Sequence, residues 1–433
     1  MRSDELTAIG NRISWNQHWL THHAISRAMG GRLECQAALT LELVADWTFA
    51  ALLTCRRRRE ATKRLAVTVG GWLWTGNVEL DSCFGCNVIG RHGLIGGCCA
   101  GFKQTFQAPA LLSPPSSMSL PSKIPRALSA FDRASNRWAA VSLCDQAPAT
   151  QRPPSRPVAP AVGRQTLSLM TWNIQASQYK PDERAGLILD HILQGPALPD
   201  IVFLQEVASS ARESLLHHPG VRSSFLTTDA EDAASFAGVP FATMTLLSSR
   251  RFGPPLLADD KGESEQGTGS PKLALDSVFR TAFPSRYKRD ALCVDIAAPG
   301  APGTVLRLLN VHLDSLDSQF RRMLEMRILA GLLREPGCSG GVVAGDFNAL
   351  DPLDDALVDK HGLVDAWVAL RGATGGATWG VGAELDDGRK PGRLDKVVML
   401  GAQPRAIDVL QPGLVGARTP WSDHCGLRCT FAI

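Results

Sequence analysis

The chain has 433 residues, of which 44% are hydrophobic and 20% are charged, and its formal net charge is +3. These values exclude a wholly disordered chain, a collagen-like fibre and a strongly basic nucleic-acid-binding protein. The length allows one large domain with an extension, or two modest domains.

The average charge conceals two different parts of the chain. Residues 1–165 contain 19 Lys and Arg against 10 Asp and Glu, whereas residues 166–433 contain 26 against 32. Seven of the 11 cysteines also lie in the first part. The second part is therefore poor in thiols, which is typical of an intracellular enzyme and does not suggest a disulfide framework.

The N-terminal sequence predicts neither secretion nor membrane insertion. The first 30 residues contain Asp4 and Glu5 and have no apolar core, which argues against a secretory signal. The most apolar stretch, residues 35–55, is interrupted by Glu42 and Asp46, and this favours a buried or amphipathic helix over a membrane span. The basic run at residues 56–59 is either a nuclear import signal or a solvated charge run. We expect an intracellular protein of the nucleus, the cytoplasm or both, with no membrane contact.

Composition divides the chain into three segments. Residues 1–108 show no persistent period and are expected to be a poorly ordered N-terminal extension of unknown structure. Residues 109–165 are rich in proline, with ten prolines between positions 109 and 160, and predict a semi-extended linker that cannot build a sheet. Residues 166–433 carry regular hydrophobic patterns and predict one folded domain.

Within residues 166–433, strands outnumber helices. Short apolar runs predict strands at residues 167–174, 200–207, 241–247, 291–296, 304–313, 341–345, 394–400 and 426–433. Helical spacing is found at residues 182–193 and 318–335, and Ser318 is expected to cap the second helix. On that helix, the face formed by Phe320, Met323, Leu324, Ile328 and Leu332 is expected to be buried. This order favours two packed sheets with helices outside.

Six of these runs end or begin in residues that can do chemistry. In chain order the tips carry Trp172-Asn173, Gln205-Glu206, Asn310-Val311-His312, Gly345-Asp346-Phe347-Asn348, Arg393-Leu394-Asp395 and Ser422-Asp423-His424. Strand tips bring residues that are distant in sequence to one rim of a sheet. So many carboxylates in one place repel each other unless a cation is bound, and oxygen ligands favour Mg²⁺, with Mn²⁺ possible.

The ordered set of six motifs resembles the endonuclease/exonuclease/phosphatase superfamily over residues 167–433. Softer segments resemble, within it, the tyrosyl-DNA phosphodiesterase 2 group: residues 283–296, 312–315, 365–367, 377–379, 393–399 and 420–431. The resemblance implies a four-layer α/β sandwich, in which two packed mixed sheets are flanked by helices. It also implies a metal-dependent phosphodiesterase, a hydrolase that acts on ester bonds in DNA repair.

The resemblance further implies roles for individual residues. It implies catalytic roles for Asn173, Asp346, Asn348, Asp395 and His424. It implies substrate contacts for His312, Ser315, Arg289 and Trp379, and metal ligation by Glu206 and Asp423.

The implied substrate is a DNA 5′ end, single-stranded or with a short overhang, that carries a tyrosyl adduct, and the implied state is a monomer. Because the net charge of this part is negative, DNA binding requires a local basic strip, for which Arg286, Lys288, Arg289, Arg321 and Arg322 are the candidates. Two alternatives stay open. One is another hydrolase of the superfamily, such as an abasic-site nuclease or a phosphatase for lipids or small molecules. The other is a catalytically silent nucleic-acid-binding module.

Overall fold

The chain divides into two compact units, Met1–Ser116 and Ser117–Ile433. The computed structural model describes residues 35–43, 47–55, 62–69 and 72–79 by their backbone alone. It describes residues 120–143, 165–195, 197–254, 272–383, 385, 389–416 and 419–433 with their side chains.

In the first unit, the described residues form one antiparallel sheet. Its strands, in the order of the sheet, are β1 (Cys35–Leu43), β2 (Trp47–Cys55), β3 (Thr62–Val69) and β4 (Trp72–Glu79). The helix predicted for residues 35–55 is therefore wrong. Leu39, Leu41 and Leu43 alternate with polar Thr40 and Glu42, and this two-residue period is the one a strand requires. The rest of the predicted extension lies outside the described residues.

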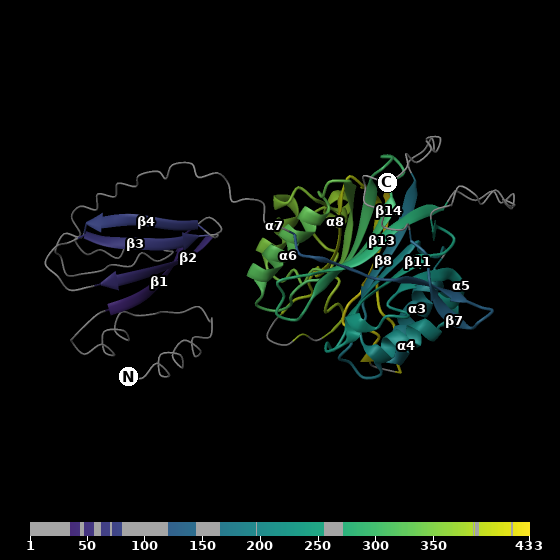
Figure 1. The fold of residues 1–433 in the computed structure, drawn as a ribbon. Coiled ribbons are helices and arrows are strands. Elements are labelled where there is room, and N and C mark those ends of the chain that lie inside the picture. Colours follow the sequence, from purple (N-terminus) through teal and green to yellow (C-terminus); the bar gives the residue numbers. More distant parts are fainter. Residues whose placement is uncertain are drawn as a thin grey trace. The chain divides into compact units, whose positions relative to one another are not determined.

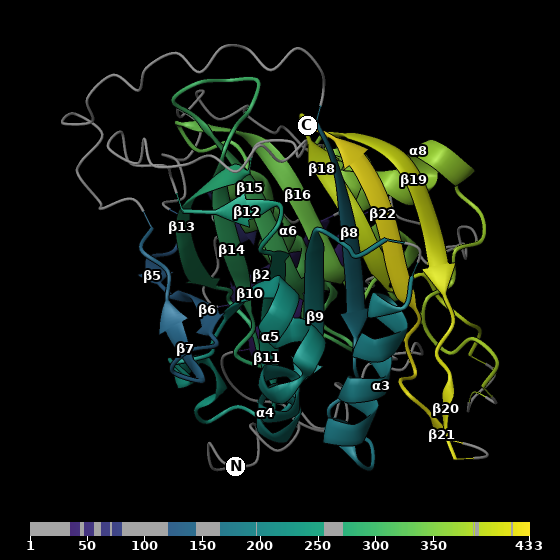
Figure 2. The ribbon, with the colours of Figure 1, turned by 90° about the vertical axis from the view of Figure 1, so that its right-hand side faces the viewer.

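The second unit contains two eight-stranded mixed sheets. The strands of the first sheet are β6 (Leu128–Asp132), β7 (Arg137–Ala140), β8 (Thr166–Asn173), β9 (Ile201–Val207), β10 (Phe225–Thr228), β11 (Ala242–Ser248), β19 (Gln403–Leu410) and β22 (Gly426–Ala432). Their order is β19-β22-β8-β9-β11-β10-β6-β7. Figure 2 shows β19, β22 and β8 side by side.

The second sheet is built from the middle of the chain, with one strand from further upstream. Its strands are β5 (Lys123–Pro125), β12 (Phe252–Gly253), β13 (Leu273–Ala282), β14 (Asp290–Ala297), β15 (Val305–His312), β16 (Cys338–Asp346), β17 (Val364–Asp365) and β18 (Asp395–Leu400). They follow the order β12-β13-β14-β15-β16-β18-β17, and β5 pairs with β13. Two short strands, β20 (Leu414–Val415) and β21 (Thr419–Pro420), form a separate ribbon.

Helices cover the outer face of each sheet, as Figure 1 shows. The helices are α3 (Pro181–Leu193), α4 (Ser209–His217), α5 (Pro219–Ser224), α6 (Gln319–Leu332), α7 (Pro352–Lys360) and α8 (Ala366–Arg371), with a short 3₁₀ turn η1 (Ala234–Phe236). One apolar cluster joins α3 and α4 to β8 and β9, and another joins α6 and α7 to β14, β15 and β16. A third cluster lies between the two sheets. The predicted four-layer α/β sandwich is confirmed.

The prediction of a linker over residues 109–165 is wrong for residues 123–140. Strand β5 pairs with β13 at the residue pairs Phe279↔Pro125 and Thr281↔Lys123, and β6 joins the first sheet beside β10. Proline is tolerated in a strand at a sheet edge, where its missing N–H costs no ladder hydrogen bond. This proline-rich segment therefore supplies edge strands of the folded unit.

The predicted apolar face of helix α6 is only partly right. Phe320 is 67% exposed, whereas the buried face includes two charged residues, Arg322 and Glu325. Arg322 donates to both carboxylate oxygens of Asp354 at 3.0 and 2.9 Å, and this pairing allows a guanidinium to replace an apolar side chain there. The Ser318 side chain makes no capping hydrogen bond, although Ser318 is the N-cap residue.

Among the residues that the structure describes, none of the helices has both the length and the apolar character that crossing a bilayer requires.

The buried ion pair on α6 yields a stability prediction. Arg322→Met should lower the free energy of unfolding by about 3–5 kcal/mol, because it leaves the Asp354 carboxylate buried without its partner. Urea denaturation followed by circular dichroism measures the loss. Arg327→Met, at an exposed position of the same helix, should change stability by less than about 0.5 kcal/mol. Equal losses in the two variants would contradict the assigned role of the pair.

Candidate active site

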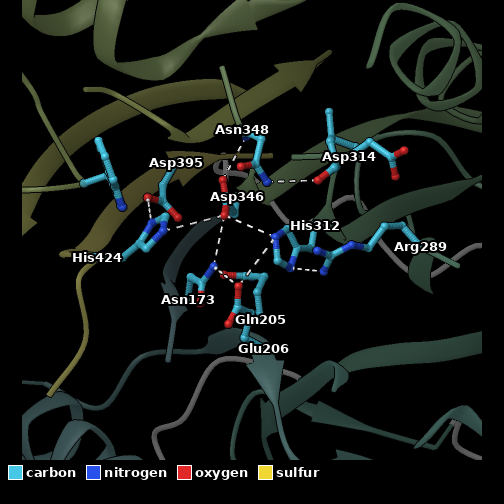
Figure 3. A network of polar contacts seen from close by, with 12 residues as sticks. Asn173, Gln205, Glu206, Arg289, His312, Asp314, Asp346, Asn348, Asp395 and His424 are labelled. Atoms are coloured by element: carbon cyan, nitrogen blue, oxygen red, sulfur yellow. Dashed lines mark hydrogen bonds and ion pairs between the residues drawn. The ribbon is translucent and has the colours of Figure 1, made fainter. Parts of the chain in front are cut away.

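The candidate site forms where the two sheets meet. Strands β8 and β9 are parallel, so Asn173 and Gln205 lie side by side at one end of the first sheet. In the second sheet, the register places Asp346 opposite both His312 and Asp395. The Asn173 amide donates to Asp346 Oδ2 at 3.0 Å, and this hydrogen bond connects the two sheets (Figure 3).

Asp346 lies at the centre of the cluster and is 1% exposed. Its Oδ1 accepts the backbone N–H of Asn348 at 2.8 Å, and its Oδ2 lies 3.3 Å from His312 Nε2 and 3.8 Å from His424 Nε2. Burial raises the pKa of Asp346 to about 7, against the opposing effect of the positive charge on His424. A carboxylate with this pKa can accept a proton at neutral pH.

His424 and Asp395 form a buried pair beside Asp346. His424 Nδ1 lies 2.7 Å from Asp395 Oδ2, and both side chains are almost fully buried. Burial alone would lower the pKa of His424, but the charges of Asp395 and Asp346 outweigh it and raise the pKa to about 10. The imidazole is therefore protonated at neutral pH and directs a charged Nε2–H into the site.

Three ionisable groups, those of Asp346, Asp395 and His424, lie close enough together to suggest a metal-binding trio. We do not assign the ion to them, because His424 Nδ1 and Asp395 Oδ2 are already hydrogen-bonded to each other at 2.7 Å. We expect the trio to serve acid–base chemistry instead.

Glu206 offers a carboxylate that is better suited to a metal ion. It is the last residue but one of β9 and has a positive φ of 53°, and its side chain is 19% exposed. Non-glycine residues rarely adopt this left-handed backbone, and such residues cluster at functional sites. Glu206 Oε1 lies 3.4 Å from Asn173 Nδ2 and 4.0 Å from His312 Nε2, so two carboxylates, Glu206 and Asp346, share the same neighbours. This set of oxygen donors fits a hard divalent cation.

Arg289 determines the form of His312. Arg289 Nη1 lies 2.5 Å from His312 Nδ1, and a guanidinium can only donate, so Nδ1 accepts and the ring proton lies on Nε2. Burial and the nearby positive charges of Arg289 and His424 keep the pKa of His312 well below its ordinary value. The Phe241 ring stacks on the imidazole at 5.9 Å and lies 4.8 Å from the Arg289 guanidinium. His312 is therefore a neutral donor whose Nε2–H points at Asp346.

A buried arginine holds the loops that carry the site. Arg184 of α3 is fully buried, and its guanidinium donates to the carbonyl oxygens of Ile174 and Gln175, which follow β8. It also donates to the carbonyl of Trp421, just before the Ser422-Asp423-His424 segment, at 2.6 Å. The Ser422 hydroxyl adds a 2.7 Å hydrogen bond to the Asn173 carbonyl. These bonds fix the distance between the first and last motifs.

The structure therefore brings together seven of the predicted site residues: Asn173, Glu206, His312, Asp346, Asn348, Asp395 and His424 (Figure 3). The Asn348 amide donates to the Leu313 carbonyl at 2.9 Å, and the residue has a positive φ of 47°. Their functional roles remain predictions.

The other four predicted residues, which are Arg289, Trp379, Asp423 and Ser315, are described in turn. Arg289 is half-buried and donates to His312 Nδ1. Trp379 donates to Asp423 Oδ2 at 3.1 Å, so both belong to one hydrogen-bonded pair. Ser315 is half-buried in the loop that follows β15.

The predicted basic strip is wrong at one position. Arg322 is 2% exposed and bound to Asp354, so it cannot reach DNA. The side chain of Arg286, another residue of the predicted strip, is 61% exposed and can reach solvent.

A network of polar side chains beneath the site was not predicted from the sequence. Gln205 donates to Asn310 Oδ1 at 2.8 Å, and Asn310 donates in turn to the carbonyl of Met244 at 2.9 Å. The Asp314 carboxylate accepts hydrogen bonds from Ser285 and from the Arg286 backbone. The residues of this network lie within or next to the strand-tip motifs: Gln205, Asn310 and Asp314. Their position in these motifs was therefore the feature of the sequence that could have identified them.

Comparisons with known proteins agree with the fold. Residues 170–424 match the profile of the Endonuclease/Exonuclease/phosphatase family. No sequence among the curated proteins matches the chain significantly.

Several solved structures are similar to the chain. D. rerio TDP2, complexed with a single-strand DNA product, shares 20% identity and a TM-score of 0.46, over 61% of this chain and 98% of that one. TDP2 from C. elegans shares 21% identity and a TM-score of 0.45, over 62% and 75%. A mannosyl-6-phosphatase of Bacteroides thetaiotaomicron shares 15% identity and a TM-score of 0.40, over 62% and 100%.

The His424–Asp395 pair yields a prediction on protonation. Asp395→Asn should lower the pKa of His424 from its raised value, because the carboxylate that stabilises the imidazolium is lost. Since the folded pKa lies above the unfolded value of about 6.5, the pair stabilises the fold fully below that pH and its contribution is lost as pH rises through about 10. The ¹³Cε1 shift of His424 against pH measures both effects. An unchanged midpoint in Asp395→Asn would refute the assignment.

Proposed function

Since the chain belongs to the endonuclease/exonuclease/phosphatase family, we propose that residues 166–433, with the edge strands upstream, are a Mg²⁺-dependent phosphodiesterase for blocked DNA 5′ ends. Family membership makes the chain a hydrolase of phosphoester bonds. The finer proposal is that the blocking group is a tyrosyl adduct, in keeping with the motifs that resemble the tyrosyl-DNA phosphodiesterase 2 group.

The observation that carries the proposal is the position of Asp346 between an amide and two imidazoles of opposite protonation state. Asp346 takes the proton of the attacking water. The Asn173 amide donates to the same carboxylate and so holds it in the orientation that this proton transfer requires. The charged Nε2–H of His424 donates to the phosphoryl oxygen as negative charge builds there. The neutral Nε2–H of His312 donates to a second phosphate oxygen.

Glu206 and Asp423 are the residues that would hold Mg²⁺. When bound, Mg²⁺ neutralises the phosphate oxygens and the leaving oxygen, which lets an anion approach an anion. The raised pKa of Asp346 agrees with a site in which negative charge is costly until a cation is present.

Aromatic and cationic side chains lie next to this cluster. Phe241, Tyr287 and Arg289 line a hollow that His312 borders. Aromatic rings and a guanidinium are the surfaces on which a phenolic ring or a base packs. The phenolate is a good leaving group, since the pKa of a free phenol is about 10, so the metal and the orientation of water matter more than a general acid.

The central role of Asp346 is tested by substitution. Asp346→Asn should lower kcat by about 10²–10⁴-fold, because the amide cannot take a proton from water, while the fold is kept. The matched control is Asp408→Asn, an exposed carboxylate on β19 that pairs with Arg371. Initial rates with a 5′-phosphotyrosyl oligonucleotide measure the effect. A rate within threefold of the unsubstituted protein would rule out Asp346 as the base.

A substrate panel tests the reaction. The full chain with Mg²⁺ should release tyrosine from a 5′-phosphotyrosyl oligonucleotide faster than it cleaves an abasic duplex or a phosphoinositide, and EDTA should abolish the rate. Faster turnover of the abasic duplex or of the phosphoinositide would identify another hydrolase of the family. Binding of the oligonucleotide without turnover of any substrate would identify a silent binding module.

A further inference from the structure

A second hollow lies away from the catalytic cluster, between helix α6 and the C-terminal end of α7. It has a volume of about 410 Å³, within the usual size range of small-molecule sites. Its lining consists of Leu120, Arg327, Ile328, Ala330, Gly331, Arg334, Lys360 and His361.

The hollow has a positive lining. Among the described residues that line it, four of eight are basic and none is acidic. Two carboxylates are next in sequence to the lining residues: Glu335, which is paired with Lys123 and Arg307 at 2.5 Å each, and Asp359, which is exposed and does not line the hollow. The cationic groups of the hollow are therefore not neutralised by Glu335.

One of the cations is held in place before any ligand arrives. Arg334 donates to the carbonyl of Ala330 on its own helix at 3.0 Å and to the carbonyl of His361, after α7, at 2.6 Å. These two bonds fix the guanidinium across the gap between the helices and use only two of its five N–H donors. A fixed guanidinium loses little side-chain entropy on binding an anion.

The opposite wall is apolar. Leu120 packs so closely on α6 that a Cβ at Gly331 would lie 2.8 Å from a Leu120 methyl carbon. Glycine at position 331 therefore makes room for the leucine, which closes one side of the hollow together with Ile328. The basic residues can bind a phosphate, and the apolar wall can contact an organic group attached to it.

His361 reports the potential in the hollow. Burial lowers its pKa, and the positive charges of Lys360, Arg334 and Arg327 lower it further. The imidazole is thus half-buried among cations, and a bound anion would relieve the repulsion between these cations.

The hollow is distinct from the catalytic site. Strand β16 runs from Cys338, five residues after the α6 C-cap Leu333, to Asp346 in the catalytic cluster, and its nine residues span about 26–30 Å at about 3.3 Å per residue. Helices α6 and α7 lie next to one another on the outer face of the second sheet (Figure 1). A phosphate bound to the catalytic residues does not also fill this hollow.

We propose that the hollow between α6 and α7 is a second anion site, which binds a phosphate group through Arg327, Arg334, Lys360 and His361. The phosphate belongs either to a free small molecule, such as a mononucleotide, or to the backbone of a nucleic acid strand. The proposal does not depend on the catalytic function, since none of its residues belongs to the catalytic cluster.

The test follows the ¹³Cε1 signal of His361 in the full chain while inorganic phosphate, a 5′-mononucleotide or a short oligonucleotide is added. Each titration is compared with chloride at the same ionic strength, because salt alone screens the cations. Saturable binding should raise the pKa of His361, since an anion favours the imidazolium. Tightest binding by the oligonucleotide would identify strand phosphates as the ligand, and binding of all three with similar affinity would identify the phosphate group alone.

The variant Arg327→Gln/Lys360→Gln should weaken this binding by about tenfold or more, since it removes two charge-assisted contacts. Arg405→Gln, an exposed arginine on β19, should leave it unchanged. Both variants should hydrolyse a small aryl phosphodiester at the same rate as the unsubstituted protein. A His361 signal that responds only as it does to chloride, or binding that the double substitution leaves intact, would overturn the proposal.

Discussion

The hydrogen bond between Asn173 and Asp346 is the contact on which the site depends, because its two residues belong to different sheets. Asp346 stands at the end of β16 and Asn173 at the end of β8, so the bond exists only if the two sheets pack with their rims level. The apolar cluster between the sheets sets that packing. Burial at the junction raises the pKa of the carboxylate, and the same burial makes the neighbouring imidazoles and amides strong partners.

Buried arginines make this junction possible. The loops at the rim cannot form ladder hydrogen bonds, yet their carbonyl groups still require donors. Arg184 supplies donors to the loops around β8 and β22, and Arg322 supplies them to the carbonyls of Asp314 and Leu316. Glycine is required at one point: a Cβ at Gly345 would lie 1.9 Å from the Val311 carbonyl oxygen, so only glycine lets β15 and β16 approach there. The fold therefore places buried arginines and a glycine where it positions the residues of the candidate site.

The strand-tip residues could be predicted from the sequence because each motif ends an apolar run, and a local pattern is enough to show it. What the sequence could not show depends on distant partners. Strand β13 contains Arg280, which reads as a surface residue until Asp229 and Asp290 are placed beside it. Likewise, the buried face of α6 contains Arg322 because Asp354 on α7 neutralises it. The edge strand β5 could not be recognised because it lies in a proline-rich segment, and such a segment indicates a linker unless an exposed sheet edge is known to be available.

We propose that one divalent ion binds at Glu206, near Asp346, and leaves Asp395 and His424 free of metal. Anomalous diffraction from crystals soaked in Mn²⁺ tests it most directly. The account predicts one peak within about 2.5 Å of a Glu206 carboxylate oxygen, with the His424–Asp395 hydrogen bond intact. A peak bonded to His424 or Asp395, with Glu206 unoccupied, would contradict it.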